Sequence, residues 1–313
     1  MPTDPRESTH AVERELFLRS MTFDRRVSGA WNQLGNAMRD EFFGAGSFLY
    51  KEGSPADAIY FIVRGTVELI APGIEPRELG SRSVVGIIDA QLERPHTRSA
   101  LAKTDVEALV VSTDDWFEVF EDNFESTRSL ILFLAAGLHE LTLELPNGGF
   151  SDPDDAGPMP EPDPLPLVER VLTLREVRMF ERASIQALVS LAPVAVEVRV
   201  RKGELLFAPD QIQGEFLVVA RGLVELEREN PRLVARFGPA SVVGGSAALG
   251  DAERFYSARA LSDSVLLRIR EEDFFDVMED HFDLARSVLA FMAEQRDHVT
   301  REIARRKSAR PAA

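Results

Sequence analysis

The sequence predicts a mainly β fold with flanking helices (α+β), present twice along a chain of 313 residues. Three observations support this prediction. The two halves of the chain match each other, short β-rich runs recur between turn signals, and an apolar stripe at helical spacing closes each half. At roughly 100–200 residues per domain, a chain of this length holds two domains, and each half is long enough to bury its own core.

The internal repeat keeps a nearly constant offset. Two pairs of segments match at an offset of 158 residues: 83–102 with 241–260, and 114–133 with 272–291. Upstream, residues 46–69 match residues 203–226 at an offset of 157. A period of about 157 residues is too long for a solenoid repeat, so the pattern indicates a duplicated domain.

Each copy is expected to run from a helix through short strands to a second helix. Residues 30–40 carry apolar side chains at helical spacing. Residues 58–63 and 66–70 are β-rich runs joined at Arg64-Gly65, where glycine supplies the positive φ of a tight hairpin. Arg221-Gly222 repeats this device in the second copy.

Short strands then continue to residue 111, which suggests a sandwich or a barrel. Asp114 or Asp115 is a candidate cap for the helix that follows. The helical stripe that closes the first copy comprises Leu130, Phe133, Leu134, Leu138, Leu141 and Leu145. The stripe that closes the second copy comprises Val288, Met292, Gln295, Val299 and Ile303.

A proline-rich acidic stretch separates the two copies. Residues 146–166 hold five acids, no base and seven of the 18 prolines, so we expect an extended, solvated linker. The expected domains are therefore residues 1–145 and 167–300. Residues 301–313 form a basic tail.

The composition excludes several classes of protein. A formal net charge of −16 argues against a mainly electrostatic binder of nucleic acid, so we expect no nucleic-acid partner. The absence of cysteine excludes disulfides, thiolate catalysis and cysteine-bound zinc. No apolar stretch reaches the length of a transmembrane helix, and the first residues contain no signal-peptide core, so we expect a cytoplasmic protein.

No catalytic or metal-binding motif stands out in the chain. No pair of the five histidines has the helix-face spacing of a zinc site, and no GxxxxGK[ST] phosphate loop occurs. No nucleophile is accompanied by a placed base. We therefore expect neither a metal site nor an enzyme.

Several features recur at the same place in both copies. A glycine precedes the first core strand at 46 and 203, and Arg-Gly-x-Val-Glu-Leu occurs at 64–69 and 221–226. A Leu-Gly or Phe-Gly turn leads into Ser-Val-Val-Gly, and an acidic-aromatic helix start follows near 114 and 272. These features resemble the cyclic nucleotide-binding domain family. The resemblance implies two jelly-roll β-barrels, and the tandem arrangement is similar to the regulatory subunits of the cyclic AMP (cAMP)-dependent kinase.

The resemblance also implies where a ligand would bind. In the family, a cassette with the pattern Phe-Gly-Glu-Leu-Ala-Leu, then Pro-Arg-x-Ala-Ser/Thr, holds the nucleotide. Backbone N–H groups and the arginine hold its cyclic phosphate, and the glutamate binds the ribose hydroxyl. The first copy has a degenerate cassette made of Gly86, His96, Arg98 and Ser99, with Ile87 in place of the glutamate. The second copy has Gly244, Gly245, Ser246, Arg254 and Ser257, with Gly245 in place of the glutamate.

Three hypotheses of function follow. The chain is a scaffold that keeps the fold for protein contacts, a sensor that binds a cyclic nucleotide weakly in the second copy, or a kinase-regulatory protein acting through Arg25–Ser28. The motif Arg-Arg-Val-Ser at 25–28 is also compatible with a basic turn in which Ser28 caps a helix. The stripe from Leu130 to Leu145 is expected either to pack on its own domain or to form a homodimer. No cofactor is expected apart from a weakly bound cyclic nucleotide.

Overall fold

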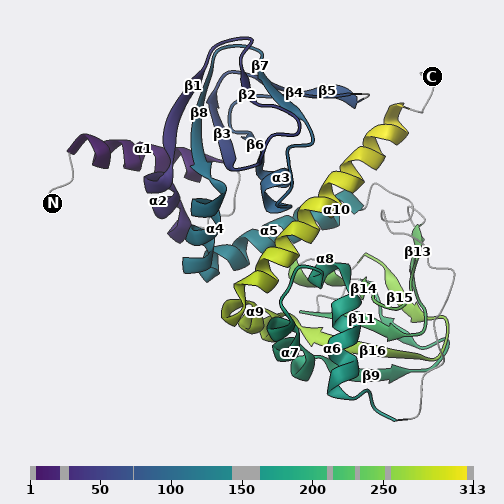
Figure 1. The fold of residues 1–313 in the computed structure, drawn as a ribbon. Coiled ribbons are helices and arrows are strands. Elements are labelled where there is room, and N and C mark those ends of the chain that lie inside the picture. The colour runs from purple at the N-terminus through teal and green to yellow at the C-terminus, as the bar shows by residue number, and fades with distance from the viewer. Residues whose placement is uncertain are drawn as a thin grey trace. The chain divides into compact units, whose positions relative to one another are not determined.

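The computed structural model divides the chain into two compact units, Met1–Leu130 (unit 1) and Ile131–Ala313 (unit 2) (Figure 1). It describes residues 5–21, 28–72, 74–142, 163–209, 214–229, 233–250 and 255–308. The division falls within helix α5 (Phe124–Thr142), whose second half therefore belongs to unit 2.

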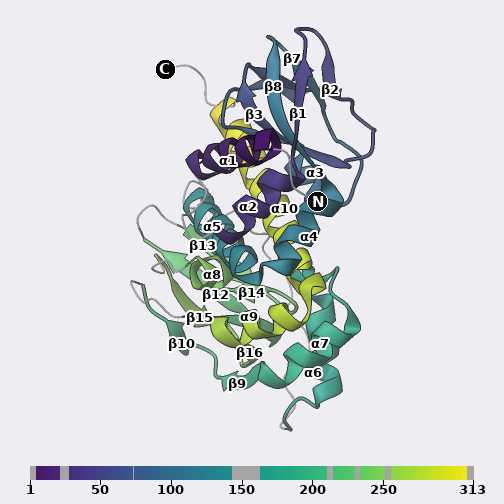
Figure 2. The same ribbon diagram turned by 90° about the vertical axis from the view of Figure 1, so that its left-hand side faces the viewer.

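The described part of unit 1 runs through two helices, eight strands and two more helices before α5. These elements are α1 (Pro5–Ser20), α2 (Ser28–Ala37), β1 (Arg39–Phe43), β2 (Phe48–Tyr50), β3 (Ala58–Arg64), β4 (Val67–Ala71), β5 (Ile74–Leu79), β6 (Val84–Val85), α3 (Ile87–Gln91), β7 (Ser99–Ala102), β8 (Val106–Ser112) and α4 (Thr113–Asp122). Helix α1 lies against α2, as Figure 2 shows.

Unit 2 repeats this order after the second half of α5. Its further elements are α6 (Leu167–Glu176), the 3₁₀ helix η2 (Arg178–Phe180), α7 (Ile185–Val194), β9 (Val196–Val200), β10 (Leu205–Phe207), β11 (Glu215–Arg221), β12 (Val224–Arg228), β13 (Leu233–Phe237), β14 (Val242–Val243), α8 (Gly245–Leu249), β15 (Ser257–Ala260), β16 (Ser264–Arg270), α9 (Glu271–Asp280) and α10 (Phe282–Ser308).

The described strands of each unit form two four-stranded antiparallel sheets. The strand orders are β1-β8-β3-β6 and β2-β7-β4-β5 in unit 1, and β9-β16-β11-β14 and β10-β15-β12-β13 in unit 2. The equivalent strands occupy equivalent positions, which confirms the duplicated domain. This arrangement confirms the expected mainly β, jelly-roll-like fold with flanking helices. Among the described strands no pairing joins the two sheets of a unit, so of the two expected alternatives the structure shows a sandwich.

Helices cover the outer face of one sheet in each unit, and this explains the continuous apolar runs in the sequence. All residues from Ala58 to Ile62 in β3 are buried. Tyr60 and Ile62 face the core between the sheets, whereas the ring of Phe61 lies 6.1 Å from that of Trp116 in α4. In unit 2 the ring of Phe216 lies 5.1 Å from that of Phe274 in α9. A strand buried on both faces has no polar side to alternate with.

The glycine turn expected to close a hairpin has a different role. Gly65 has the positive φ that we expected, 96°. However, β3 pairs with β8 and β6, whereas β4 pairs with β7 and β5. The chain therefore passes from one sheet to the other at Gly65, and the prediction of a β3–β4 hairpin is wrong. A Cβ atom at Gly65 would lie 2.2 Å from the carbonyl oxygen of Asp105, so this corner leaves no room for a side chain.

The helix that follows β8 begins slightly earlier than expected. Ser112 is the N-cap of α4, since its hydroxyl oxygen accepts a hydrogen bond from the backbone N–H of Asp115 at 3.0 Å. Asp114 and Asp115 lie in the first turn, where their negative charges interact favourably with the positive end of the helix dipole and stabilise the helix. The expected capping by one of these two aspartates is therefore wrong.

The expected linker lies mostly outside the described residues, which resume at 163. Of its described residues, Leu165 packs within unit 2. Leu165 is 6% exposed, and its backbone N–H donates to a carboxylate oxygen of Glu197 at 2.7 Å. The guanidinium of Arg170 donates to the carbonyl oxygen of Leu165 at 3.1 Å. The expectation of a solvated stretch therefore does not hold for Leu165.

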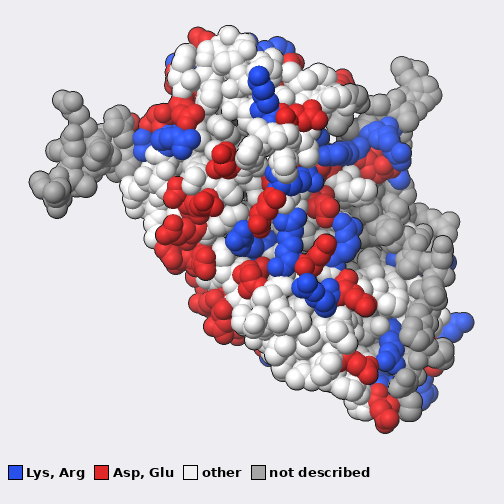
Figure 3. Space-filling view, viewed as in Figure 1, with Lys and Arg blue, Asp and Glu red and all other residues white. Residues whose placement is uncertain are grey.

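The last described residues of the chain are helical. Helix α10 continues to Ser308, so residues 301–308 do not form a separate tail. Three arginines in this part of the helix pair with acids of the same helix: Arg301 with Asp297 at 2.5 Å, and Arg305 and Arg306 with Glu302 at 3.1 and 2.8 Å. Figure 3 shows acidic and basic side chains interspersed along α10. None of the helices in the described parts of the chain is long and apolar enough to span a bilayer.

The corner at Gly65 gives a direct test of the fold. Gly46 and Gly65 both have positive φ, but a Cβ atom at Gly46 would have no heavy atom within 4 Å. We expect Gly46→Ala to lower the free energy of unfolding by about 1–2 kcal/mol through backbone strain alone. Gly65→Ala should cost about 2 kcal/mol more, because the backbone of Asp105 must move. Urea unfolding, followed by the emission of Trp31 and Trp116, measures both losses, and equal losses would contradict the corner geometry.

Candidate functional site

The two candidate cassettes have the same backbone geometry. In each unit a two-residue strand, β6 or β14, leads into a glycine with left-handed φ and then into a five-residue helix, α3 or α8. The values of φ are 88° at Gly86 and 82° at Gly244. The two units differ in the side chains that follow this turn.

In unit 1 the residue at the expected arginine position is built into the core. His96 is 2% exposed, and its imidazole stacks on the ring of Tyr50 with centroids 3.5 Å apart. Its backbone N–H donates to the carbonyl oxygen of Ser54 at 2.9 Å, and its carbonyl oxygen accepts from the N–H of Gly53 at 2.8 Å. His96 is therefore fixed by packing and by backbone hydrogen bonds.

A buried carboxylate holds the loop between α3 and β7. Asp89 is 8% exposed and accepts hydrogen bonds from Nε of Arg94 at 2.8 Å, from the N–H of Thr97 at 3.0 Å and from the hydroxyl of Thr97 at 3.2 Å. Nδ1 of His96 lies 3.7 Å from the same carboxylate. Burial would raise the pKa of Asp89, but the contact with His96 and the donors of Thr97 and Arg94 outweigh it and lower the pKa to about 2.

The remaining candidate residues of unit 1 surround this loop. The hydroxyl oxygen of Ser99 accepts a hydrogen bond from the N–H of Glu52 at 3.0 Å, which ties β7 to the loop after β2. Arg98 is partly buried. Burial raises the pKa of the Tyr50 hydroxyl, the charge of Asp89 raises it further, and Arg98 opposes this shift. The structure thus places Gly86, His96, Arg98 and Ser99 in one loop region.

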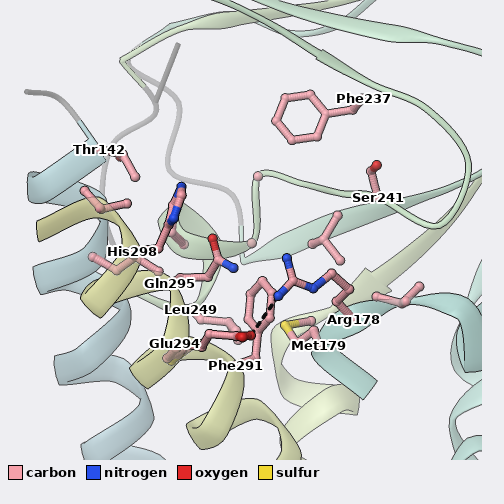
Figure 4. A pocket seen from close by; sticks show the side chains of 18 of the residues that line it. Thr142, Arg178, Met179, Phe237, Ser241, Leu249, Phe291, Glu294, Gln295 and His298 are labelled. Carbon is pink, nitrogen blue, oxygen red and sulfur yellow. Dashed lines mark hydrogen bonds and ion pairs between the residues drawn. The ribbon is translucent and has the colours of Figure 1, made fainter. Parts of the chain in front are cut away.

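Unit 2 contains a cavity of about 500 Å³ beside its cassette turn. Gly244, Gly245 and Ser246 line the cavity, together with Leu226 of β12 and Phe237 of β13. The second half of α5, η2 and α10 supply the other walls. Figure 4 shows Glu294, Gln295 and His298 of α10 on one side of the cavity, and Phe237 and Ser241 on the other.

The walls of the cavity are mainly apolar, with ion pairs among the lining residues. Arg178 of η2 donates to Glu294 of α10 at 2.8 Å, which Figure 4 marks, and Arg306 donates to Glu302 at 2.8 Å. The lining residues therefore include two arginines and two glutamates whose charges oppose each other in pairs. This arrangement suits a ligand with a flat or apolar body better than a highly charged one.

The structure separates the candidate residues of unit 2. Ser246 lies at the cavity, and its hydroxyl oxygen is 3.5 Å from Nδ1 of His139. The hydroxyl of Ser257 donates to the carbonyl oxygen of Glu227 at 3.3 Å, and Ser257 does not line the cavity. Arg254 lies outside the described residues. Tyr256 is 6% exposed and forms part of the cavity wall, with its ring 5.7 Å from that of Phe207.

Some lining residues could be found from the sequence and others could not. Met292, Gln295 and Val299 belong to the helical stripe that closes the second copy, and all three line the cavity. Arg178 and Met179 gave no signal, because they lie far from the cassette along the chain and reach the cavity only through the position of η2. Among the described residues, no three His, Asp or Glu side chains converge in a way that could hold a metal ion.

A family model for the cyclic nucleotide-binding domain matches the chain twice, at residues 40–123 and 197–281. The chain belongs to this family. The two matches correspond to the repeat found in the sequence, so unit 1 contains cyclic nucleotide-binding domain 1 and unit 2 contains domain 2. A search of curated proteins gives no match.

Solved structures of protein kinase A regulatory subunits align along most of the chain. The regulatory domain of Toxoplasma gondii PKA with cAMP is 13% identical, covers 94% of this chain and 99% of its own, and gives a TM-score of 0.35. The regulatory subunit of a cAMP-independent protein kinase A from Trypanosoma cruzi, bound to guanosine, is also 13% identical, covers 100% and 98%, and gives a TM-score of 0.35. With TM-scores below 0.5, these likenesses support no inference about ligand or partner.

The buried carboxylate of domain 1 makes the stability of unit 1 depend on pH. The pKa of Asp89 is lower in the folded chain than its ordinary value of 3.8, so its contribution to stability is complete above about pH 4 and is lost as the pH falls through about 2. A shift of this size corresponds to about 2 kcal/mol. In urea unfolding, the difference between the wild type and Asp89→Asn should therefore shrink as the pH is lowered from 5 to 2. A difference independent of pH would contradict this interpretation.

Proposed function

We propose that this chain is a non-enzymatic regulatory protein whose two domains have different tasks. Domain 1 is a scaffold with a closed cassette. Domain 2 binds a small ligand of the nucleotide or nucleoside type, and the chain acts through contacts with protein partners. The observation that carries this proposal is the cavity beside the cassette turn of domain 2.

The size and the composition of the cavity support a small ligand. A volume of about 500 Å³ lies within the range of about 300–1,000 Å³ that is usual for small-molecule sites. Aromatic and aliphatic side chains such as Phe237, Tyr256 and Met292 can pack on a flat ring, while Ser241, Ser246 and Gln295 offer hydrogen bonds at its edge.

Helix α10 provides a route from ligand to regulation. It contributes residues from Phe291 to Arg306 to the cavity wall, and it is the 27-residue helix that ends the described chain. A ligand in the cavity therefore contacts both the cassette turn and α10. If it binds one arrangement of α10 more tightly than another, it shifts the population toward that arrangement.

We expect cAMP itself to bind weakly. Gly245 stands where the cassette of the family has its glutamate, so a charged hydrogen bond to the ribose is missing. Such a bond is worth about 1.5–3 kcal/mol. Starting from a micromolar site, this loss predicts a Kd no tighter than tens of micromolar, measurable by isothermal titration calorimetry of the full chain. A submicromolar Kd would contradict this expectation, because it would mean that the missing glutamate costs no affinity.

Two pairs of variants locate this binding. Arg254→Ala should abolish it, because Arg254 is the arginine of the second cassette, whereas Arg98→Ala in domain 1 should leave the Kd unchanged. Gln295→Trp places a large ring at the cavity wall and should also abolish binding, whereas Arg296→Trp, on an exposed neighbour that does not line the cavity, should not. Binding that survives both Arg254→Ala and Gln295→Trp would place the ligand elsewhere and overturn the proposal.

The other hypotheses stay predictions. Arg25, Arg26 and Val27 lie outside the described residues, and α2 begins at Ser28. A homodimer through the stripe from Leu130 to Leu145 has less apolar surface available than the sequence suggested. Leu138 packs with Val299, Leu141 and Ile303 in one cluster within unit 2, and Leu145 lies outside the described residues. Light scattering of the full chain distinguishes monomer from dimer.

A further inference from the structure

The loop between α3 and β7 surrounds Asp89 with donors that are all within eight residues of it along the chain. They are the backbone N–H and the hydroxyl of Thr97 and the guanidinium of Arg94, with the imidazole of His96 at 3.7 Å. A backbone N–H, a hydroxyl and a guanidinium are the groups that proteins use to bind a small oxyanion. Here the oxyanion is a side chain of the same loop.

Domain 2 shows the same turn without this carboxylate. The repeat offset places Ala247 at the position of Asp89, and Ala247 is buried. Phe255 stands at the position of Thr97, so the hydroxyl donor is missing as well. The turn of domain 2 borders a cavity, whereas the loop of domain 1 is closed on its own acid.

The imidazole of His96 lies beside Asp89 and is itself buried. The imidazole of His96 is held by Tyr50 on one face, and Nδ1 of His96 has no hydrogen-bond partner. Removal of the carboxylate would leave Thr97 and Arg94 without this acceptor beside the buried imidazole of His96, and a buried donor that loses its acceptor is costly. Thr97 is exposed and the side chain of Arg94 is 35% exposed, so these two donors can be reached from solvent. The same donors would then be available to an anion from solution.

We propose that the loop of domain 1 is an oxyanion-binding site occupied by the carboxylate of Asp89, and that this built-in anion keeps the domain in a closed state without a ligand. The chemical class that the emptied site takes is a small oxyanion, a carboxylate or a phosphate. The proposal goes beyond the proposed function, because it does not depend on whether domain 2 binds a ligand.

Chemical rescue of the full chain tests the proposal. Asp89→Ala empties the site and should lower the Tm of unit 1, which the emission of Trp31 and Trp116 reports because both tryptophans lie in that unit. Sodium acetate or sodium phosphate at about tenfold above its Kd should restore the Tm by about 3–5 °C more than in the wild type. Sodium chloride at equal ionic strength should not.

Asp105→Ala is the matched control. Asp105 lies in the same unit and accepts a hydrogen bond from the N–H of Ala45 at 2.9 Å, but it is exposed and encloses no site. This variant should lose stability without specific rescue by acetate or phosphate. Equal effects of these anions on Asp89→Ala, Asp105→Ala and the wild type would overturn the proposal.

A second variant is needed in case Asp89→Ala does not fold. Asp89→Ser also removes the carboxylate, but it leaves a polar side chain in the loop, and it should give the same pattern of rescue. If neither variant folds even in the presence of acetate or phosphate, the donors do not form a site that a free anion can fill, and the proposal is wrong.

Discussion

A buried carboxylate needs hydrogen-bond donors, and in unit 1 this requirement determines the path of the loop after α3. The desolvation cost of Asp89 is offset only when Arg94 and Thr97 turn back toward α3, eight residues or fewer along the chain. That turn carries His96 inward onto Tyr50 and positions Ser99 at the start of β7. The course of this loop in domain 1 is thus a consequence of one acidic side chain.

Domain 2 has the same backbone turn, but side-chain packing determines the conformation around it. With Ala247 in place of the acid, nothing requires donors at the turn, and packing decides the position of the neighbouring side chains. Phe255 lies 4.5 Å from the ring of His139 and beneath the guanidinium of Arg228, which is 4.8 Å from the ring centroid. Tyr256 joins the core between the sheets. The turn at Gly244 is therefore a wall of a cavity, and α10 supplies the opposite wall.

Local signals in the sequence predicted the elements better than their pairing. The strands and the left-handed glycines were predictable because each depends on neighbouring residues. The repeat was predictable because the two halves of the sequence match each other directly. Gly65 was assigned to a hairpin because a tight hairpin needs a positive φ. A corner between two sheets needs the same φ, and only the pairing partners of β3 and β4 distinguish the two arrangements. The role of Asp89 was missed because a carboxylate in a loop is usually solvated, and its burial depends on how the whole loop closes. Arg178 was missed because it lies in η2, which is not part of the cassette motif.

If only domain 2 responds to ligand, hydrogen–deuterium exchange of the full chain with and without millimolar cAMP will distinguish the two domains. We expect slower exchange in residues 240–250 and 291–306, which contribute to the cavity wall, and unchanged exchange in residues 84–99, whose loop is already held by Asp89. Slower exchange in residues 84–99, or no slowing in either region, would contradict this expectation.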